Sequence, residues 1–299
     1  MKIAIQGFQG SFHEVAARQY FGAVPALSFC ATFGEVVAQV ADGRADAALM
    51  AMENSLAGSI LPNYLLLERN ALTITGEVYL PIHQHLLVLP GTPLASVQAV
   101  HSHPMALRQC GDFLGQHTTW QLVETEDTGL SAQHLAERRT PGVAVVAGAQ
   151  AAEAFGLEIL APAINDDPNN YTRFLVLERA AEAAPVAQPD KASLYFYTSH
   201  APGMLAQVLT LVASHGLNLS KLQSCPRPSQ PWHYGFHADV EFSAPAQLEA
   251  LLAELPAVTE ELRVLGAYAR GSMAFGQDTT APVIASAAKQ SHQSELLAQ

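Results

Sequence analysis

Thr172 and Arg173 are the two residues whose types and position most clearly suggest chemistry. They follow turn-forming residues at 165–170 and precede the apolar run 174–177, which predicts a loop leading into a strand. An arginine keeps its charge when it is buried, so at the mouth of an apolar strand it needs an anion. That anion is either a carboxylate of the protein or a carboxylate of a bound ligand, and the local pattern alone favours the first.

Three more groups of polar residues follow apolar runs typical of buried strands, at 2–6, 46–52 and 97–101. Ligands of open α/β sheets bind at the carboxyl ends of the strands, so these groups are candidates for a ligand site. The groups are Gly7, Gly10 and Ser11; Glu53, Asn54 and Ser55; and Ser102, His103 and Gln109.

The first of these groups also opens a helix. Ser11 and Glu14 have the spacing of a capping box, and Gly7 and Gly10 bracket the turn before it. Free backbone amides at a helix N-terminus favour an anion. The alternative is that the glycines only allow a tight strand-to-helix turn, and a single turn of this kind favours that alternative.

The composition limits the classes of function. The 299 residues are 49% apolar, enough for two or three globular domains. A net charge of −12 with 15 Lys and Arg leaves no basic cluster for nucleic acid. The sequence has neither a membrane-spanning apolar run nor a signal peptide before Gly7, so we expect a cytoplasmic protein. Its 3 cysteines lie too far apart to predict disulfides or a metal knuckle.

The order of the predicted elements indicates two kinds of domain. Helices and strands alternate up to about residue 178, which predicts a mostly parallel α/β sheet arrangement, and 179–190 has the composition of a linker. Residues 271–299 lack apolar periodicity, so we expect a disordered tail. Between them the order is βαββαβ, which predicts a ferredoxin-like sandwich, with strands at 193–198, 217–224, 234–242 and 262–268 and helices at 204–215 and 246–255.

The four polar groups, taken in their order along the chain, resemble the motifs of monofunctional prephenate dehydratases with a C-terminal ACT domain. The family's ENSxxG motif is intact at 53–58 and its NxTRF motif is present at 170–174. Its GPxGTFS and SHPQALxQC motifs are similar to residues 7–13 and 102–110, with departures at Phe8, Ser11, His13 and Met105. The resemblance runs from residue 1 to about 268.

The resemblance implies a fold and an assembly. The catalytic domain is expected at 1–178, with a two-lobed α/β fold similar to that of type II periplasmic binding proteins. A homodimer or homotetramer without a cofactor is also implied, with prephenate as substrate and phenylalanine as effector. The expected boundaries are lobes at about 1–77 plus 165–178 and at 78–164, a linker at 179–190, the ACT domain at 191–270 and the tail at 271–299.

The implied reaction is the decarboxylating dehydration of prephenate to phenylpyruvate in phenylalanine biosynthesis, catalysed by a carbon–oxygen lyase. Hydroxide is a poor leaving group, so the site needs a preorganised hydrogen-bond donor at the departing oxygen. The resemblance assigns that donor to Thr172 and a substrate carboxylate to Arg173. It implies further catalytic roles for Asn54, Ser55 and Gln109, and further substrate contacts from Gly10, Ser11, Glu53, Ser102, His103 and Phe174.

The regulatory motifs match less completely. The family's PGAL motif is present as PGML at 202–205, and its NLTKIESRP motif is similar to 218–226, with Gln223 and Cys225 in place of glutamate and arginine. In the family these motifs bind phenylalanine across a dimer interface and inhibit, and the two departures leave the strength of inhibition open. The implied effector-binding residues are Pro202, Gly203, Met204, Leu205, Asn218, Leu219 and Ser220.

Other interpretations use the same residues. A non-catalytic sensor of an aromatic acid would share the fold, but it would need Arg173 and not Thr172, and the sequence has no export signal for a periplasmic receptor. Two histidine pairs, 83 with 85 and 101 with 103, are candidates for a metal site that no residue at ligand spacing completes. The loop from Gly7 to Gly10 lacks the GxGxxG pattern of a dinucleotide site.

Overall fold

The computed structural model describes residues 1–22, 26–227 and 230–272, so the tail expected at 271–299 lies almost wholly outside the described residues. Contacts divide the chain into two compact units. The first unit contains Met1–Thr32 and Leu80–Tyr171, and the second contains Phe33–Tyr79 and Thr172–Ser272. In the described part of the chain, no helix has the length and apolarity needed to cross a membrane.

The first unit begins with a strand, a helix and a strand: β1 (Lys2–Gln6), α1 (Phe12–Phe21) and β2 (Ala26–Cys30). β1 pairs in parallel with β2, and its central residues 3–5 are fully buried. An uninterrupted apolar run is what a strand needs when both of its faces are covered. The strand predicted at 2–6 is therefore confirmed.

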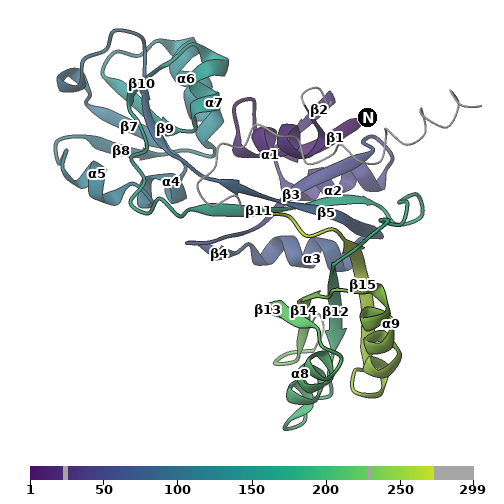
Figure 1. Ribbon diagram of the computed structural model, residues 1–299. Coiled ribbons are helices and arrows are strands. Elements are labelled where there is room, and N and C mark those ends of the chain that lie inside the picture. Colours follow the sequence, from purple (N-terminus) through teal and green to yellow (C-terminus); the bar gives the residue numbers. More distant parts are fainter. Residues whose placement is uncertain (23–25, 228–229, 273–299) are drawn as a thin grey trace, which may run out of the picture. The chain divides into compact units, whose positions relative to one another are not determined.

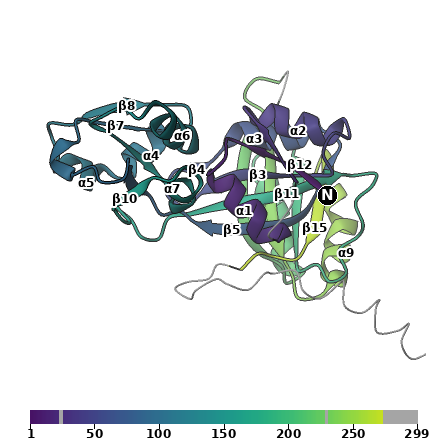
Figure 2. The same cartoon turned by 90° about the horizontal axis from the view of Figure 1, so that it is seen from above.

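The rest of the first unit is a five-stranded sheet, with the order β10-β6-β9-β7-β8 and helices on both faces (Figure 1). β7 pairs in parallel with β8, its neighbour in Figure 2, and with β9, whereas β6 pairs antiparallel with β9 and β10. The elements are β6 (His85–Val88), η1 (Leu94–Ser96), β7 (Ala99–Ser102), α4 (Pro104–Arg108), α5 (Gly111–Gly115), β8 (Gln121–Glu124), α6 (Thr128–Arg138), β9 (Val143–Ala147), α7 (Ala149–Phe155) and β10 (Glu158–Ala161).

Alternate residues of the central strands pack against helices on opposite faces. Leu86 and Val146 belong to the core that includes residues of α4 and α5. Leu87 and Val145 belong to the core that includes residues of α6 and α7. This alternation follows from the two-residue repeat of a strand.

The second unit contains a sheet in which β11 lies between β3 and β5, while β4 pairs with β3. The central residues of both β3 and β11 are buried, in agreement with their apolar sequences. The elements are α2 (Phe33–Ala41), β3 (Ala47–Asn54), β4 (Gly58–Ser59), α3 (Leu61–Arg69), β5 (Leu72–Pro81) and β11 (Tyr171–Arg179).

The prediction of a mostly parallel sheet is wrong. β11 pairs antiparallel with β3, and β6 pairs antiparallel with both of its neighbours. Alternation of helices and strands predicts parallel pairing only where a helix carries the chain back to the same end of the sheet. β11 instead follows a loop with no helix. Gly58 and Ser59 form the short strand β4, and α3 begins after it at Leu61.

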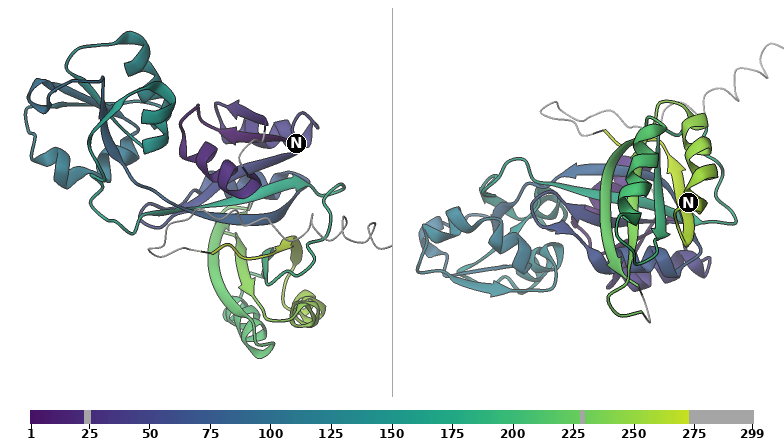
Figure 3. Two further views of the ribbon diagram at one scale, coloured as in Figure 1. Left: turned by 45° about the horizontal axis from the view of Figure 1, so that its top comes forward. Right: turned by 90° about the horizontal axis from the view of Figure 1, so that it is seen from below.

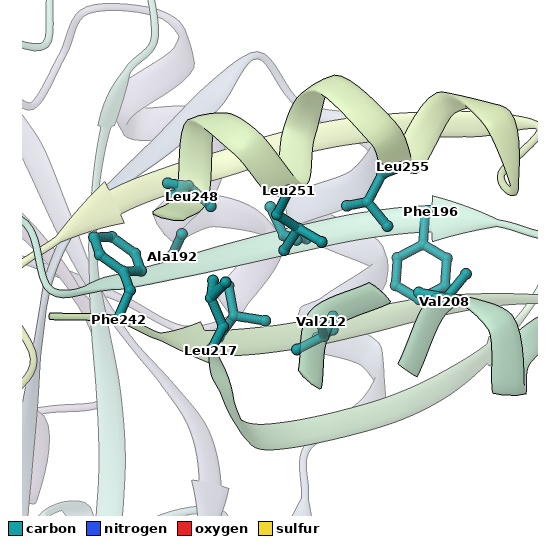
Figure 4. Close-up of a cluster of buried hydrophobic side chains, with 12 residues drawn as sticks. Ala192, Phe196, Val208, Val212, Leu217, Phe242, Leu248, Leu251 and Leu255 are labelled. Carbon is teal, nitrogen blue, oxygen red and sulfur yellow. The ribbon is translucent and has the colours of Figure 1, made fainter. Parts of the chain in front are cut away.

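The C-terminal part of the second unit has the predicted βαββαβ order and forms an antiparallel sheet with strand order β13-β14-β12-β15. Its two helices lie side by side in Figure 3 and cover one face. Figure 4 shows the core between them and the strands, which includes Phe196, Val208 and Leu251. The elements are β12 (Lys191–Tyr197), α8 (Met204–Ser214), β13 (Asn218–Pro226), β14 (Tyr234–Glu241), α9 (Pro245–Glu254), η2 (Leu255–Ala257) and β15 (Glu261–Tyr268).

This ferredoxin-like domain lies directly against β5. Thr73 Oγ1 donates a hydrogen bond of 3.0 Å to the carbonyl oxygen of Leu265 in β15. A Cβ atom on the next residue, Gly266, would lie 2.1 Å from the carbonyl oxygen of Ile74, so only glycine fits there. The close approach of β15 to β5 places the two parts of the second unit in contact.

Candidate active site and effector site

The end of β3, a turn and β4 form a hairpin at residues 53–59, the position of the ENSxxG motif. Asn54 pairs with Gly58 across the two strands. Its Oδ1 atom accepts hydrogen bonds from the backbone N–H groups of Leu56 (3.1 Å) and Ala57 (2.9 Å). Asparagine commonly closes turns in this way. Gly58 has a φ of +81°, which glycine adopts at little steric cost. The motif therefore encodes the turn.

Thr172 lies opposite Asn54 in the pairing of β11 with β3, and Asn54 Nδ2 donates a hydrogen bond of 3.1 Å to Thr172 Oγ1. Because Asn54 Oδ1 accepts from two backbone N–H groups, its amide nitrogen must be the atom that faces Thr172. A hydroxyl that accepts one hydrogen bond still has its own hydrogen to donate. Both residues are partly exposed, so Thr172 can act as a donor toward a ligand.

The partners of Arg173 are side chains of the protein. Its Nε donates to Glu77 (2.7 Å), its Nη1 to Asp239 (2.5 Å) and more distantly to Glu53 (3.4 Å), and its Nη2 to the Tyr268 hydroxyl (3.1 Å). The Arg173 side chain is only 3% exposed. Burial would lower its pKa, but Asp239, Tyr268 and Glu77 outweigh that effect and raise it well above its ordinary value. These contacts favour a structural role for Arg173, in which the anion that it needs is a carboxylate of the protein and not of a ligand.

Two lysines from the ferredoxin-like domain complete this group of charges. Lys191 Nζ lies 3.0 Å from Glu77 Oε1, and both side chains are buried. Lys221 Nζ forms an ion pair with Glu53 and donates to Ser59 Oγ at 2.7 Å. The carboxylates of Glu53, Glu77 and Asp239 therefore face an equal number of cations, from Lys191, Lys221 and Arg173.

The loop that leads into α1 is closed by its own side chains. Ser11 Oγ accepts from the Glu14 N–H at 3.3 Å, which confirms Ser11 as the N-cap of α1. The reciprocal bond of a capping box is shifted by one residue, because Glu14 Oε2 accepts from the Gly10 N–H at 2.8 Å and not from that of Ser11. The Ser11 N–H donates to the Phe8 carbonyl. A substrate anion at these two amides would have to displace such partners, so the substrate roles of Gly10 and Ser11 stay predictions.

In the first unit, Ser102 and His103 precede α4, and Gln109 caps its C-terminal end. Ser102 is buried and donates to the Val146 carbonyl at 2.6 Å, a structural use of its hydroxyl. His103 Nδ1 accepts from the Met105 N–H and caps α4. Gln109 Oε1 accepts from Asn170 Nδ2 at 3.0 Å. Gln109 thus holds the loop that leads to Thr172.

The remaining members of the predicted site differ in exposure. Ser55 is exposed on the turn of the 53–59 hairpin. Phe174 is 1% exposed and pairs with Ala51 across β11 and β3, so it lies in the core. The structure brings Asn54, Ser55 and Thr172 together within the second unit.

Several polar residues around these groups were missed by the sequence analysis. Asp127 caps α6 through Leu130, and a Cβ atom on Gly7 would lie 3.2 Å from its Oδ2. Burial raises the pKa of Asp127. Lys221 lies within the quoted regulatory motif, but its spacing gave no indication of a partner. Glu77, Lys191 and Asp239 lie in no motif, and no local pattern marks them.

One histidine of each pair accepts a hydrogen bond from the backbone. His85 Nδ1 accepts from the Ala163 N–H at 3.0 Å, as His103 Nδ1 does from Met105. Among the residues that the structure describes, no group of three or more His, Cys, Asp or Glu side chains is placed to hold a metal ion.

The ferredoxin-like domain contains a cavity of about 510 Å³ at the start of α8. Four of its lining residues are the predicted effector contacts Pro202, Gly203, Met204 and Leu205. The others include polar groups as well as the ring of Phe236, so the cavity offers both apolar and polar contacts to a small ligand. The other predicted contacts, Asn218, Leu219 and Ser220, lie at the start of β13.

Sequence comparisons identify similar proteins. The family model described as prephenate dehydratase matches residues 3–182. The bifunctional chorismate mutase/prephenate dehydratase of Escherichia coli K12 is 33% identical over 275 residues, covering 89% of this chain and 70% of that protein. Arogenate dehydratase 5 of Arabidopsis thaliana, a chloroplastic protein, is 37% identical over 289 residues, covering 90% of this chain and 67% of that protein.

Solved structures of the same fold cover nearly the whole chain. The prephenate dehydratase of Arthrobacter aurescens, in complex with L-Phe, has a TM-score of 0.83 and 28% identity, and the match covers 99% of this chain and 98% of that one. A protein described as a novel type of quorum quenching acylase, GqqA, has a TM-score of 0.81 and 33% identity, with 90% and 98% covered.

Proposed function

Because the chain belongs to the prephenate dehydratase family, we propose that it converts prephenate to phenylpyruvate, carbon dioxide and water in phenylalanine biosynthesis. This is a carbon–oxygen lyase reaction. The bond to the ring carboxylate breaks, its electron pair enters the ring, and the ring hydroxyl leaves with a proton as water. Aromatisation supplies the driving force, so the protein's task is to stabilise the departing oxygen.

The hydrogen bond from Asn54 to Thr172 is the observation that best supports this proposal. It leaves the Thr172 hydroxyl hydrogen free to point toward a ligand, and the hairpin turn fixes the amide that orients it. A threonine hydroxyl is too weak an acid to act as an ordinary general acid. We therefore assign it as a preorganised hydrogen-bond donor to the leaving oxygen.

The other roles belong to the same proposal. Asn54 orients Thr172, and Gln109 positions the preceding loop through Asn170. Arg173 is assigned to the contact with the ferredoxin-like domain, because its donors already face carboxylates of the protein. Substrate contacts are proposed for the exposed Ser55 and His103 and for Gly10 and Ser11.

Phenylalanine is proposed as the effector of the ferredoxin-like domain, which we assign as an ACT domain at 191–270. The cavity beside Pro202 and Gly203 supports this assignment, as does the L-Phe bound to the Arthrobacter aurescens relative. We also propose a catalytic domain at 1–178, a homodimer or homotetramer, and a cytoplasmic location. Calorimetry with phenylalanine tests the effector, and sedimentation tests the oligomer.

The names of the relatives suggest two other substrates. Arogenate, the substrate named for the plant relative, shares the leaving hydroxyl. An acylase would need an activated nucleophile, and a hydroxyl nucleophile is activated by a neighbouring base. The hydrogen-bond partner found for Thr172 is the amide of Asn54, which is not a base. The site geometry therefore favours dehydration.

The direct test is incubation of the pure protein with prephenate while the absorbance of phenylpyruvate in alkali is followed. Parallel incubations with arogenate and with an acyl-amide substrate distinguish the alternatives. Turnover of prephenate supports the proposal. Binding of prephenate without turnover of any of the three compounds would instead indicate a sensor.

A further inference from the structure

Lys221 connects the strand that carries the second regulatory motif to the 53–59 hairpin. It lies on β13, next to the predicted effector contact Ser220. Its Nζ atom contacts both arms of the hairpin, Glu53 on β3 and Ser59 on β4, which are themselves paired across the two strands. One side chain therefore spans the hairpin from the ferredoxin-like domain.

A β-bulge gives Lys221 this direction. In the pairing of β13 with β14, Leu219 lies opposite Val240 and Lys221 opposite Asp239, so Ser220 is the extra residue. Both Leu219 and Leu222 pack against the domain core, although a regular strand would place them on opposite faces. The bulge between them turns Lys221 to the same face as Asp239, away from that core and toward the hairpin.

The ion pair of Lys221 with Glu53 is weaker than the buried ion pairs beside it. The side chains of Arg173, Glu77 and Lys191 are at most 3% exposed, and removal of one charge from such a cluster strongly destabilises a protein. Lys221 and Glu53 are 20% and 24% exposed, so solvent reaches their ion pair and weakens it relative to the buried pairs. The contact at Lys221 can therefore break and reform without unfolding the unit.

A displacement of the hairpin reaches Thr172 directly. Glu53 and Asn54 are adjacent residues, paired with Arg173 and Thr172 respectively. Arg173 fixes β11 to Glu77 and Asp239 through shorter contacts than the 3.4 Å contact to Glu53, so β11 stays in place when the hairpin moves. The group that changes is the amide of Asn54, whose bond to Thr172 orients the hydroxyl.

We propose that Lys221 is a positioning residue that couples the effector site to catalysis, by holding the 53–59 hairpin in the arrangement that orients Thr172. The proposal rests on the proposed function and names the contact through which the effector acts. Movement of the start of β13 on phenylalanine binding displaces Lys221, and with it Glu53 and Ser59.

The test uses the full chain with Lys221→Gln, which removes the charge and keeps a polar side chain. An allosteric effector is expected to change wild-type kcat/KM for prephenate by roughly 5–150-fold. In Lys221→Gln we expect the ratio of kcat/KM without and with saturating phenylalanine to fall to within about twofold of one. Calorimetry should still detect phenylalanine binding. Lys221→Arg, which keeps the charge, should retain the wild-type ratio.

Amide hydrogen exchange provides a measurement that needs no turnover. The N–H groups of Leu56 and Ala57 are held by Asn54, so their exchange rates report on the hairpin. Phenylalanine should change these rates in the wild type and not in Lys221→Gln. A protein that does not turn over prephenate would contradict the proposed function and leave this outcome intact.

Arg227→Gln is the matched control, because Arg227 follows β13 directly and pairs with Glu260 at 2.7 Å within the same domain. Its side chain is 23% exposed, close to the exposure of Lys221. We expect this variant to respond to phenylalanine as the wild type does. The inference is overturned if phenylalanine affects Lys221→Gln and the wild type equally, or if it leaves the wild-type hairpin unchanged.

Discussion

Thr172 and Arg173 are neighbours in sequence, but they occupy opposite faces of β11. Thr172 is partly exposed and accepts a single hydrogen bond from Asn54, which leaves its own hydrogen available. Arg173 is buried against the ferredoxin-like domain among three carboxylates. Since successive side chains of a strand alternate in direction, one motif can supply both a reactive group and its anchor. The difference teaches that motif membership alone does not assign a role.

Replacement of Arg173, the buried residue of the pair, should have the largest effect on stability. Arg173→Met leaves the carboxylate of Asp239 buried without its main partner, and loss of one partner from a buried ion pair costs about 3–5 kcal/mol of unfolding free energy. Urea unfolding of the purified variant measures this loss. Arg270→Met, at an exposed ion pair with Asp190, should change stability by less than about 1 kcal/mol.

Arg173→Lys tests whether Arg173 has a structural role or binds substrate. If Arg173 held a substrate carboxylate, this variant would raise KM strongly while leaving the unfolding free energy near the wild-type value. We expect the opposite order, with a clear loss of stability, because lysine cannot reproduce the forked contacts to Glu77 and Asp239.

Replacement on the other face should affect catalysis alone. Thr172→Val keeps the shape of the side chain and removes the donor, so kcat should fall by about 10²–10³-fold, as when one preorganised donor is lost from an active site. KM should change by only a few fold. A Thr172→Val enzyme with wild-type kcat would remove this residue from the mechanism, and Thr172→Ser, which restores the donor, should recover most of the activity.

The pKa of His237 tests whether water is excluded from the contact between the ferredoxin-like domain and the rest of the second unit. This residue lies on β14 beside Asp239, between the rings of Tyr64 and Tyr195. Burial is the main cause that lowers its pKa to about 4; Asp239 opposes this effect, and Arg263 adds to it. Since the unfolded chain takes up this proton near pH 6.5, stability is full above that pH and falls as the pH decreases toward 4.

The expected loss is about 2 kcal/mol between pH 7.5 and pH 5 from this group. Urea unfolding of the wild type and of His237→Gln at both pH values measures it, since other titrating groups contribute to both proteins. A wild type that loses no more stability than the variant would show that water reaches His237, and that water also screens the charges of Asp239 and Arg173 beside it.

The sequence was sufficient for the elements of the ferredoxin-like domain. Turn residues separate its strands, and apolar periodicity marks its helices, so the predicted bounds agree with α8 and β14 to within a residue or two. The sheets of the catalytic part were predicted less well. Strand direction there depends on how the loop before β11 returns to the sheet, and the pattern within a strand does not encode that return.

In the candidate site, too, the sequence predicted the local features and missed the contacts between distant residues. The N-cap at Ser11 and the turn closed by Asn54 are local, so their spacing was visible in the sequence. Two partners of Arg173, Glu77 and Asp239, are 96 and 66 residues away, and no local pattern reports such a contact. The bulge at Ser220 did have a signal, because Leu219 and Leu222 are three residues apart instead of two or four.

The long sequence separation between Arg173 and Asp239 has a consequence for synthesis on the ribosome. The last 66 residues before Asp239 take about 3–13 s to add at typical elongation rates. During that interval Glu53 and Glu77 are already made, but Arg173 still lacks Asp239 and Tyr268, and the ferredoxin-like domain that buries it is incomplete. A chain released before β14 is made would keep its family motifs intact and still be a poor folder, and it would be a natural client for chaperones.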